Sequence, residues 1–177
     1  MEVFLNSIFT FFRGFGFFTL CFSYILGFFL SKNNFIKLGN FLILDLTLNL
    51  LLKKFFSILM GDKKYPLIGS GKRPIDSVSC DFFIPRKKFK NLKNSYGMPS
   101  GHSQTFAFIT TLIYLYLNKK QDKNNYKYIF LIIFTLLAMF MRVYIEKCHT
   151  IQQTIVGSTI GIILAIILVK YYGNPFH

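Results

Sequence analysis

At its centre the chain reads Tyr96-Gly97-Met98-Pro99-Ser100-Gly101-His102-Ser103-Gln104. Pro99 fixes its own φ and lacks an N–H, so it suits the entry to a helix, where Ser100 is a typical N-cap. Gly101 lets another group approach the backbone closely. The free N–H groups of such a helix attract anions, and His102 beside them can exchange a proton. The stretch predicts a phosphate site at a helix start; the alternative is an ordinary helix start with a structural histidine.

The composition is that of a membrane protein. Of the 177 residues, 53% are hydrophobic and 23 are Phe, and the mean hydropathy is +0.44. This apolar fraction is too high for a typical soluble domain. The net charge is +14, but the basic residues lie between apolar runs and form no nucleic-acid-binding motif. We therefore expect membrane lipid or phosphate as the partner, and no nucleic acid.

Five apolar runs are long enough to form transmembrane helices. They cover residues of about 4–30, 35–60, 101–117, 128–143 and 150–172. The first run lacks a small-residue cleavage site, so we expect a retained helix, the alternative being a signal peptide. The sequence predicts an all-α, polytopic membrane bundle in a single domain, 1–177, with a basic loop at 61–99. In the last run, Gly157 and Gly161 are spaced for close helix packing.

Three polar residues interrupt the second run at intervals of four. Asp45, Asn49 and Lys53 therefore share one helix face. Charged groups in hydrocarbon usually face a bundle interior or water, so this face is predicted to point inward; the alternative is that Lys53 snorkels at a helix end.

The chain has three cysteines, Cys21, Cys80 and Cys148. Their spacing is not that of a metal site and indicates no disulfide framework, although one bridge between two of them is compatible with the sequence.

The alternating direction of the spans tests whether the polar features meet. The end of the second span, the start of the third and the junction of the fourth and fifth share one membrane face. Arg73, His102 and His149 lie at these three places. Their convergence predicts an active site at one face of the membrane.

The second junction, Arg142 to Gln153, carries groups suited to phosphoryl transfer. Arg142 offers a planar fork of donors for phosphate oxygens. If the last span begins near His149, Gln153 lies one turn on and can fix the tautomer of its imidazole. A neutral, oriented histidine is a competent nucleophile toward phosphorus, and His102 could protonate the leaving oxygen. The carboxylates are scattered, so we expect basic groups to stabilise the transition state.

Three motifs in this order resemble those of the type-2 phosphatidic acid phosphatase superfamily of integral membrane lipid phosphatases. Lys-Arg-Pro at 72–74, Pro99 to His102, and Arg142 with His149 are similar to its first, second and third motifs. The dolichyl diphosphatase branch is the most similar. Its second and third motifs resemble Gly97-Met98-Pro99-Ser100-x-His102-Ser103-Gln104 and His149-Thr150-x-x-Gln153-x-x-x-Gly157. The resemblance covers about residues 49–157.

Three positions depart from the pattern of that family. Pro66 lies seven residues before Arg73, where the family has lysine. Met141 replaces the family's serine, and one extra residue separates Arg142 from His149. This insertion affects the position of the nucleophile, His149, within the motif. The alternative is that the protein is a catalytically inactive relative of the family. The candidates for the motif lysine are, in order of preference, Lys53, Lys54 and Lys64.

The resemblance implies hydrolysis of a polyprenyl, dolichyl-type diphosphate to the monophosphate through a phosphohistidine. His149 would attack the terminal phosphorus, His102 would protonate the departing oxygen, and Gln153 would orient the nucleophile. The implied phosphate-binding residues are Arg73, Arg142, Ser100, Gly101 and Lys53. No metal, other cofactor or obligate protein partner is expected. The resemblance also implies a multi-pass protein of the endoplasmic reticulum membrane.

Other functions are compatible with the same residues. A phosphatase of lipid monophosphates such as phosphatidate would use the same site, although Gln153, where most relatives have Asp, argues against it. A non-catalytic, lipid-binding membrane protein is an alternative from another class. A pore or transporter is weakly supported because the polar residues collect at one face. The basic loop predicts a cytosolic site by the positive-inside rule, whereas the resembled family works in the lumen.

Overall fold

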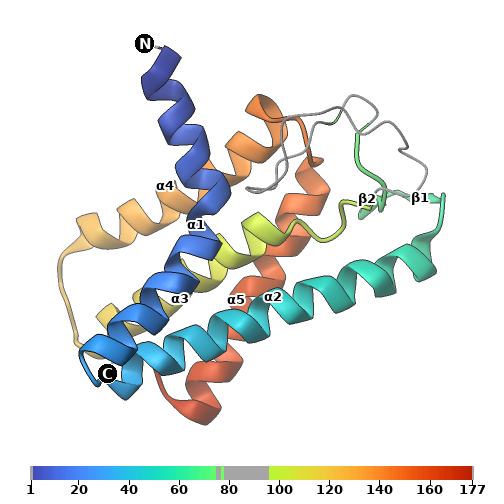
Figure 1. Cartoon of the computed structure of the whole chain (residues 1–177). Helices are drawn as coiled ribbons and strands as arrows, with labels where there is room; N and C mark the ends of the chain where they lie inside the picture. The colour runs from blue at the N-terminus through green and yellow to red at the C-terminus, as the bar shows by residue number, and fades with distance from the viewer. Residues whose placement is uncertain (1, 75–76, 78–95, 177) are drawn as a thin grey trace.

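The computed structural model describes residues 2–74, 77 and 96–176. These residues form five α-helices, a π-helical turn and a two-stranded antiparallel sheet (Figure 1). In chain order the elements are α1 (Glu2–Phe29), α2 (Asn33–Met60), β1 (Lys64–Tyr65), β2 (Gly69–Ser70), α3 (Gly101–Lys119), α4 (Asn125–Phe140), the π-helical η2 (Met141–Ile145) and α5 (Ile151–Tyr172). The predicted all-α bundle is confirmed, and each helix lies within a few residues of its predicted run.

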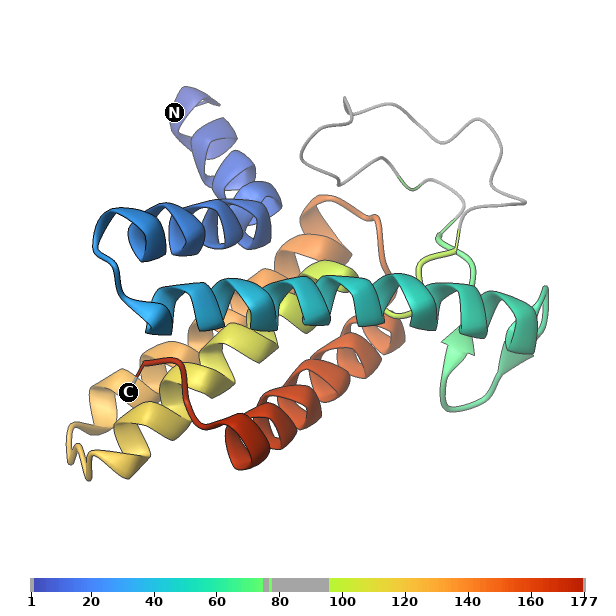
Figure 2. The same ribbon diagram turned by 60° about the horizontal axis from the view of Figure 1, so that its bottom comes forward.

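The central helix is α3, which contacts each of the other four (Figures 1 and 2). Within the described residues, four helical segments are long and apolar enough to cross a membrane: α1 from Thr10, α2, α4 together with η2, and α5. By contrast, α3 carries buried Ser103, Gln104 and Thr105 in its first turns. A helix that is packed against protein can carry such polar groups where a lipid-facing helix cannot.

Buried polar side chains tie α2 to α3. Asp45 has no exposed surface and accepts hydrogen bonds from Gln104 Nε2 at 2.9 Å and Thr105 Oγ1 at 2.7 Å. Asn49 Nδ2 donates to Gln104 Oε1 at 2.8 Å. The predicted inward face of α2 is therefore present, and these partners offset the cost of burying a carboxylate. They also fix the first turns of α3, which carry His102.

Close packing of α5 on α3 depends on two glycines. A Cβ on Gly157 would overlap the carbonyl oxygen of Ser100, and a Cβ on Gly161 would overlap that of Gln104. Backbones that approach this closely require glycine at the contact. The packing predicted from the spacing of these glycines is confirmed, and it places the start of α5 beside the start of α3.

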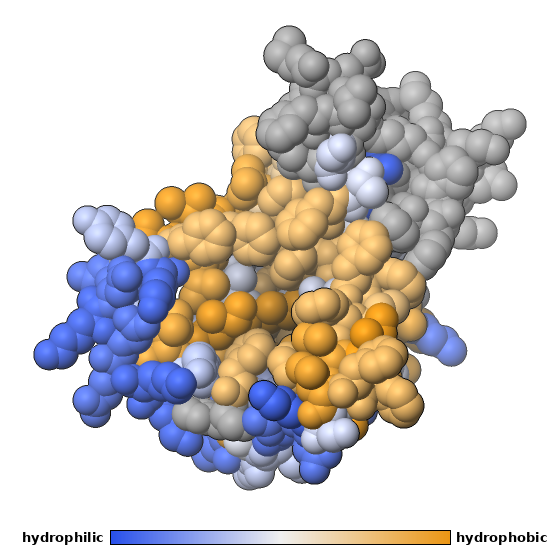
Figure 3. Space-filling view, turned by 60° about the vertical axis from the view of Figure 1, so that its left-hand side comes forward, coloured by the Kyte–Doolittle hydropathy of each residue, from blue (hydrophilic) through white to orange (hydrophobic). Residues whose placement is uncertain are grey.

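Large apolar side chains cover the outside of the bundle. Figure 3 shows a broad hydrophobic face, with hydrophilic residues gathered toward one end. The exposed apolar residues come from all four membrane-crossing segments and include Phe22, Phe28, Leu50, Ile58, Phe130, Ile132, Ile155 and Ile163. Such a surface is stable in contact with lipid and unstable in water. The protein is therefore an integral membrane protein.

A sharp bend divides α1 in its N-terminal half (Figure 2). The carbonyl oxygen of Phe12 accepts from Arg142 Nη2 at 2.6 Å, and that of Arg13 accepts from His102 Nε2 at 3.1 Å. Two glycines follow within four residues of Phe12. Side chains that bond to helix carbonyls next to glycine commonly kink a helix. The bend holds α1 against the start of α3 and against η2.

Candidate active site

Three stretches that are far apart in the sequence meet at the start of α3. The loop after β2 pairs with the loop before α3, where Gly97 N donates to Gly71 O at 2.8 Å. The start of α5 joins the same place, because Ser100 N donates to Gln153 O at 3.0 Å. The structure therefore brings together the three regions that the topology predicts to share a membrane face.

Gln153 fixes the orientation of the His149 imidazole. Its Nε2 donates to the carbonyl oxygens of Ser70 at 3.0 Å and Lys72 at 2.7 Å. Since carbonyl oxygens only accept, the amide oxygen of Gln153 must point the other way, and it lies 3.1 Å from His149 Nδ1. The proton of the neutral ring is therefore on Nδ1. His149 Nε2 retains its lone pair, which is the form that a nucleophile needs.

The start of α5 produces this geometry. Thr150 is the N-cap, its side chain accepts from Gln153 N, and the Gln153 side chain accepts from Thr150 N, which completes a capping box. Because the cap follows His149 directly, the box sets the position of Gln153 relative to the imidazole. The predicted start of the last helix near His149 is confirmed.

A π-helical turn, η2, overlaps the stretch between Arg142 and His149. Glu146 N donates to Met141 O at 2.9 Å, which is an i→i+5 hydrogen bond. A π-helical turn contains one more residue than an α-helical turn, and such turns are frequent at functional sites. The additional residue of this turn precedes the loop that leads to α5, and at the end of that loop His149 contacts Gln153.

His149 is buried among positive charges. Its side chain is almost fully enclosed. Burial, and next the positive charges of Arg73 and Lys53, hold the pKa of His149 well below its ordinary value of 6.5, although the bond to Gln153 opposes the shift. Both main causes disfavour the imidazolium. The ring is therefore neutral at pH 7.

We expect the His149 ring of the folded protein to stay neutral at pH 6.5, where an unshifted histidine is half protonated. At pH 6.5 and below, His149 binds more protons in the unfolded chain than in the folded chain. The contribution of His149 to the free energy of unfolding therefore falls as the pH falls below 6.5. Nitrogen NMR of histidine-labelled protein in micelles, assigned with His149→Ala, measures the titration. A midpoint at or above 6.5, or a proton on Nε2, would contradict this assignment.

His102 faces the same site from the first turn of α3. Its Nε2 donates to the Arg13 carbonyl oxygen, so Nδ1 is the nitrogen that remains for a substrate. This atom carries a proton only in the imidazolium. Burial, and next the positive charge of Arg142, hold the pKa of His102 well below its ordinary value of 6.5, although the bond to the Arg13 carbonyl opposes the shift. A charge on either of the two imidazoles, those of His102 and His149, acts on the other. The two histidines also lie near helix starts that are in contact, since Ser100 N, two residues before His102, donates to Gln153 O at the start of α5.

A cavity of about 420 Å³ lies between α1, α2 and α3. It has a polar part, lined by Arg13, Asn49, Lys53, Gly101 and His102, and an apolar part, lined by residues that include Phe17, Leu46, Leu50 and Phe106. Lys53 also acts electrostatically on both imidazoles, whereas Lys54 and Lys64 are exposed. Among the three candidates, the geometry supports Lys53 as the lysine of the first motif.

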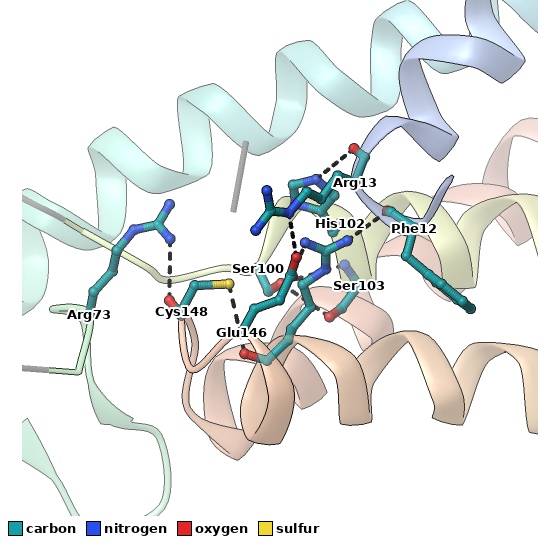
Figure 4. Close-up of polar contacts among 9 residues, drawn as sticks. Phe12, Arg13, Arg73, Ser100, His102, Ser103, Glu146 and Cys148 are labelled. Atoms are coloured by element: carbon teal, nitrogen blue, oxygen red, sulfur yellow. Dashed lines mark hydrogen bonds and ion pairs between the residues drawn. The ribbon is translucent and has the colours of Figure 1, made fainter. Parts of the chain in front are cut away.

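Arg73 approaches His149 through the preceding residue. Its Nη1 donates to the Cys148 carbonyl oxygen at 3.2 Å (Figure 4), and its charge acts on the imidazole. Cys148 is disulfide-bonded, whereas Cys21 is free. A disulfide-bonded cysteine therefore directly precedes the candidate nucleophile.

The two small residues at the start of α3 have different surroundings. Gly101 lines the cavity and lies close to Asn49, since a Cβ on Gly101 would be 2.8 Å from Asn49 Oδ1. The Ser100 hydroxyl is fully buried, accepts from Ser103 N and bonds to Ser103 Oγ at 3.1 Å. This hydroxyl therefore caps the helix and does not line the cavity, which differs from its expected place in the phosphate-binding set.

Arg142 belongs to a buried ionic cluster. Its side chain has no exposed surface; Nη1 pairs with Glu146 Oε2 and Nη2 donates to Phe12 O at 2.6 Å. The other carboxylate oxygen of Glu146 accepts from Arg13 Nε at 2.6 Å (Figure 4). Contrary to expectation, both Nη atoms of Arg142 are thus directed at protein acceptors. Its charge still acts on His102 and His149.

Arg13 and Glu146 are the polar residues at this site that the motifs do not identify. Two signals for them exist in the sequence. Arg13 is the single charged residue in an otherwise apolar run, and Glu146 follows Arg142 by four positions. A charge inside a membrane-length run usually has a buried partner, but the sequence does not show which one.

The fold and the site define a membrane-embedded helical bundle with two imidazoles beside a basic cavity, an arrangement suited to phosphate chemistry. A sequence profile of the PAP2 superfamily matches residues 16–176, and the chain therefore belongs to this superfamily. Dolichyldiphosphatase 1 of Dictyostelium discoideum is 36% identical over 93 residues, which cover 48% of this chain and 40% of that protein. No solved structure matches significantly. The family and this relative support a lipid phosphatase.

Proposed function

We propose that the protein hydrolyses a polyprenyl diphosphate of the dolichyl type to the monophosphate and inorganic phosphate. The observation that carries the proposal is the Gln153 amide, whose two donations to backbone carbonyls turn its oxygen toward His149. A lone pair is thereby kept on His149 Nε2, and the charge of Lys53, which lines the basic cavity, acts on this ring. The name of the similar Dictyostelium protein supports a diphosphate as the substrate.

The two histidines divide the proposed reaction. His149 Nε2 attacks the terminal phosphorus, so that an N–P bond forms and the bond to the bridging oxygen breaks. The negative charge of the bound diphosphate favours the imidazolium of His102, so the substrate binds together with a proton on Nδ1. His102 gives this proton to the bridging oxygen, which leaves with the lipid monophosphate. Water then attacks the phosphohistidine and gives a proton to His102. Inorganic phosphate departs, and both rings return to their initial states.

Basic groups around the cavity stabilise the charge on the transferred phosphoryl group. Lys53 and Gly101 line the cavity, and Arg73 lies beside His149. Arg142 contributes its field from its buried position. Fixed positive groups of this kind can provide most of the catalysis of phosphoryl transfer. We therefore propose that the reaction needs no divalent metal.

The purified protein tests this proposal directly. We would measure phosphate release from a polyprenyl diphosphate and from phosphatidate, each with excess chelator. Release of one phosphate per diphosphate, faster than release from phosphatidate, supports the proposal. Faster release from phosphatidate would favour the monophosphatase alternative, and release from neither would favour a non-catalytic lipid-binding protein. Activity that the chelator removes would contradict the absence of a metal requirement.

Changing Gln153 to Glu is expected to lower kcat/KM for the diphosphate by about 10–100-fold. A carboxylate cannot donate to the carbonyls of Ser70 and Lys72, and an unsatisfied buried polar group costs about 1–3 kcal/mol. If this cost falls on the transition state, each 1.4 kcal/mol or so is about tenfold in rate. Gln152→Glu is the matched control, because Gln152 is exposed and the change adds the same charge one residue away. Equal losses in both variants would show that charge, and not hydrogen bonding, controls the rate.

We also propose that the protein resides in the endoplasmic reticulum membrane with its site facing the lumen. Disulfides persist in the lumen and are rare in the cytosol, and Cys148, next to His149, is disulfide-bonded. This argument outweighs the positive-inside rule here, since basic groups at the site are used for phosphate. Glycosylation of an acceptor introduced in the α3–α4 turn, residues 120–124, would contradict this orientation.

A further inference from the structure

We propose that Arg13 of α1 binds the phosphate that stays with the lipid, and that it thereby selects diphosphates over monophosphates. The inference rests on the proposed function and assigns a substrate preference to the same site. Arg13 belongs to none of the three motifs and precedes residue 16, where the match to the PAP2 profile begins. The evidence for its role is therefore structural.

One nitrogen of the Arg13 guanidinium is anchored and another has no acceptor. Nε donates to Glu146 Oε1 at 2.6 Å, and Figure 4 shows the side chain leaving α1 toward this carboxylate. Nη2 is buried and has no hydrogen-bond partner in the part of the chain that the structure describes. Buried donors nearly always have partners in native proteins. The Arg13 guanidinium, which lines the cavity, therefore has donor capacity left for an acceptor that a ligand brings.

The cavity identifies the ligand as an anion with an apolar tail. Arg13 lines the same cavity as Lys53 and His102, and the walls continue into the apolar side chains of Leu46 and Leu50. Phosphate oxygens suit the guanidinium and the ammonium at one end. Hydrocarbon suits the other end. An isoprenoid phosphate group fits this change of polarity.

The positions of the two histidines identify which phosphate lies there. In the proposed reaction His149 binds the terminal phosphorus, and His102 gives a proton to the oxygen that leaves. Because His102 lines the cavity, the group attached to this oxygen enters the cavity beside Arg13. In a diphosphate that group is a phosphate ester with negative charge. In a monophosphate it is an uncharged alcohol or glycerol residue, which gives Arg13 no anion to bind.

Competition by two non-hydrolysable lipids with the same isoprenoid tail tests this inference. One carries a methylenediphosphonate and the other a single phosphonate, and both are measured as inhibitors of phosphate release from the diphosphate. Arg13→Gln is expected to weaken the diphosphonate by about 10–100-fold, the range for a lost hydrogen bond to a charged group, and the phosphonate by less than about threefold. Arg13→Lys keeps the charge and is expected to give an intermediate loss. The matched control is Lys37→Gln, which removes a cation whose bond to the Tyr172 carbonyl lies outside the cavity.

The outcomes separate this inference from the proposed function. Absence of activity in the wild type contradicts the proposed function itself. An active wild type whose Arg13→Gln variant loses the same factor for both inhibitors, with an unchanged melting temperature in detergent, overturns the inference. If Arg13→Gln does not fold, the Arg13→Lys variant tests the inference instead. If Arg13→Lys binds both inhibitors as tightly as the wild type does, the inference is overturned as well.

Discussion

Replacing His149 by Ala is expected to lower phosphate release from a polyprenyl diphosphate by at least about 10⁴-fold, as loss of a covalent nucleophile commonly does. Of the histidines that the structure describes, His149 has Nε2 available, because Gln153 bonds to its Nδ1, whereas the Nε2 of His102 is used by the Arg13 carbonyl. The measurement is single-turnover release of labelled phosphate from purified protein. His177→Ala is the matched histidine control, since it lies outside the three motifs.

Trapping of the labelled enzyme distinguishes nucleophilic loss from general damage. We expect wild-type protein, quenched in base, to retain label in an acid-labile linkage, as phosphohistidine does. The His149→Ala variant should retain none. His102→Asn is expected to turn over about 10²–10⁴-fold more slowly and to accumulate label if activation of water becomes the slow step. If the His149→Ala variant retained label, this result would contradict the proposed mechanism.

Much of the fold follows from rules that act locally along the chain. Apolar runs of membrane length form helices because the bilayer leaves few alternatives for the backbone. Pro99 and Ser100 mark the start of α3, and Thr150 with Gln153 marks the start of α5. The alternation of the spans then predicts that these helix starts meet. Because each step uses only neighbouring residues or topology, a single sequence is sufficient.

The remaining features depend on contacts between distant residues. The pairing of Arg13 with Glu146 joins positions separated by 133 in the sequence, and no local pattern shows it. The number of residues between Arg142 and His149 can be counted in the sequence, but the π-helical turn η2 in this region cannot be predicted from it. In the same way, the sequence offers three lysines for the first motif, and the cavity is what supports Lys53.

Replacing Glu146 by Ala is expected to destabilise the protein by about 3–5 kcal/mol, the usual cost of removing one partner from a buried ion pair. The carboxylate lies between Arg13 and Arg142, and its side chain is fully buried. Without it, the enclosed guanidinium of Arg142 keeps the Phe12 carbonyl but loses its counter-charge. The stability is measured by reversible unfolding in mixed micelles of a mild detergent and SDS.

A second ion pair provides the control, and a compensating variant tests the cause. Asp122 pairs with Lys127 near the surface, so Asp122→Ala should destabilise the protein far less than Glu146→Ala. The triple change Arg13→Met, Arg142→Met and Glu146→Leu removes all three charges together. This triple variant should recover most of the stability lost in Glu146→Ala, because no uncompensated charge remains buried. Its phosphate release should stay low, because both arginines are absent. If the triple variant is no more stable than Glu146→Ala, packing around Glu146, and not its charge, holds α1 to η2.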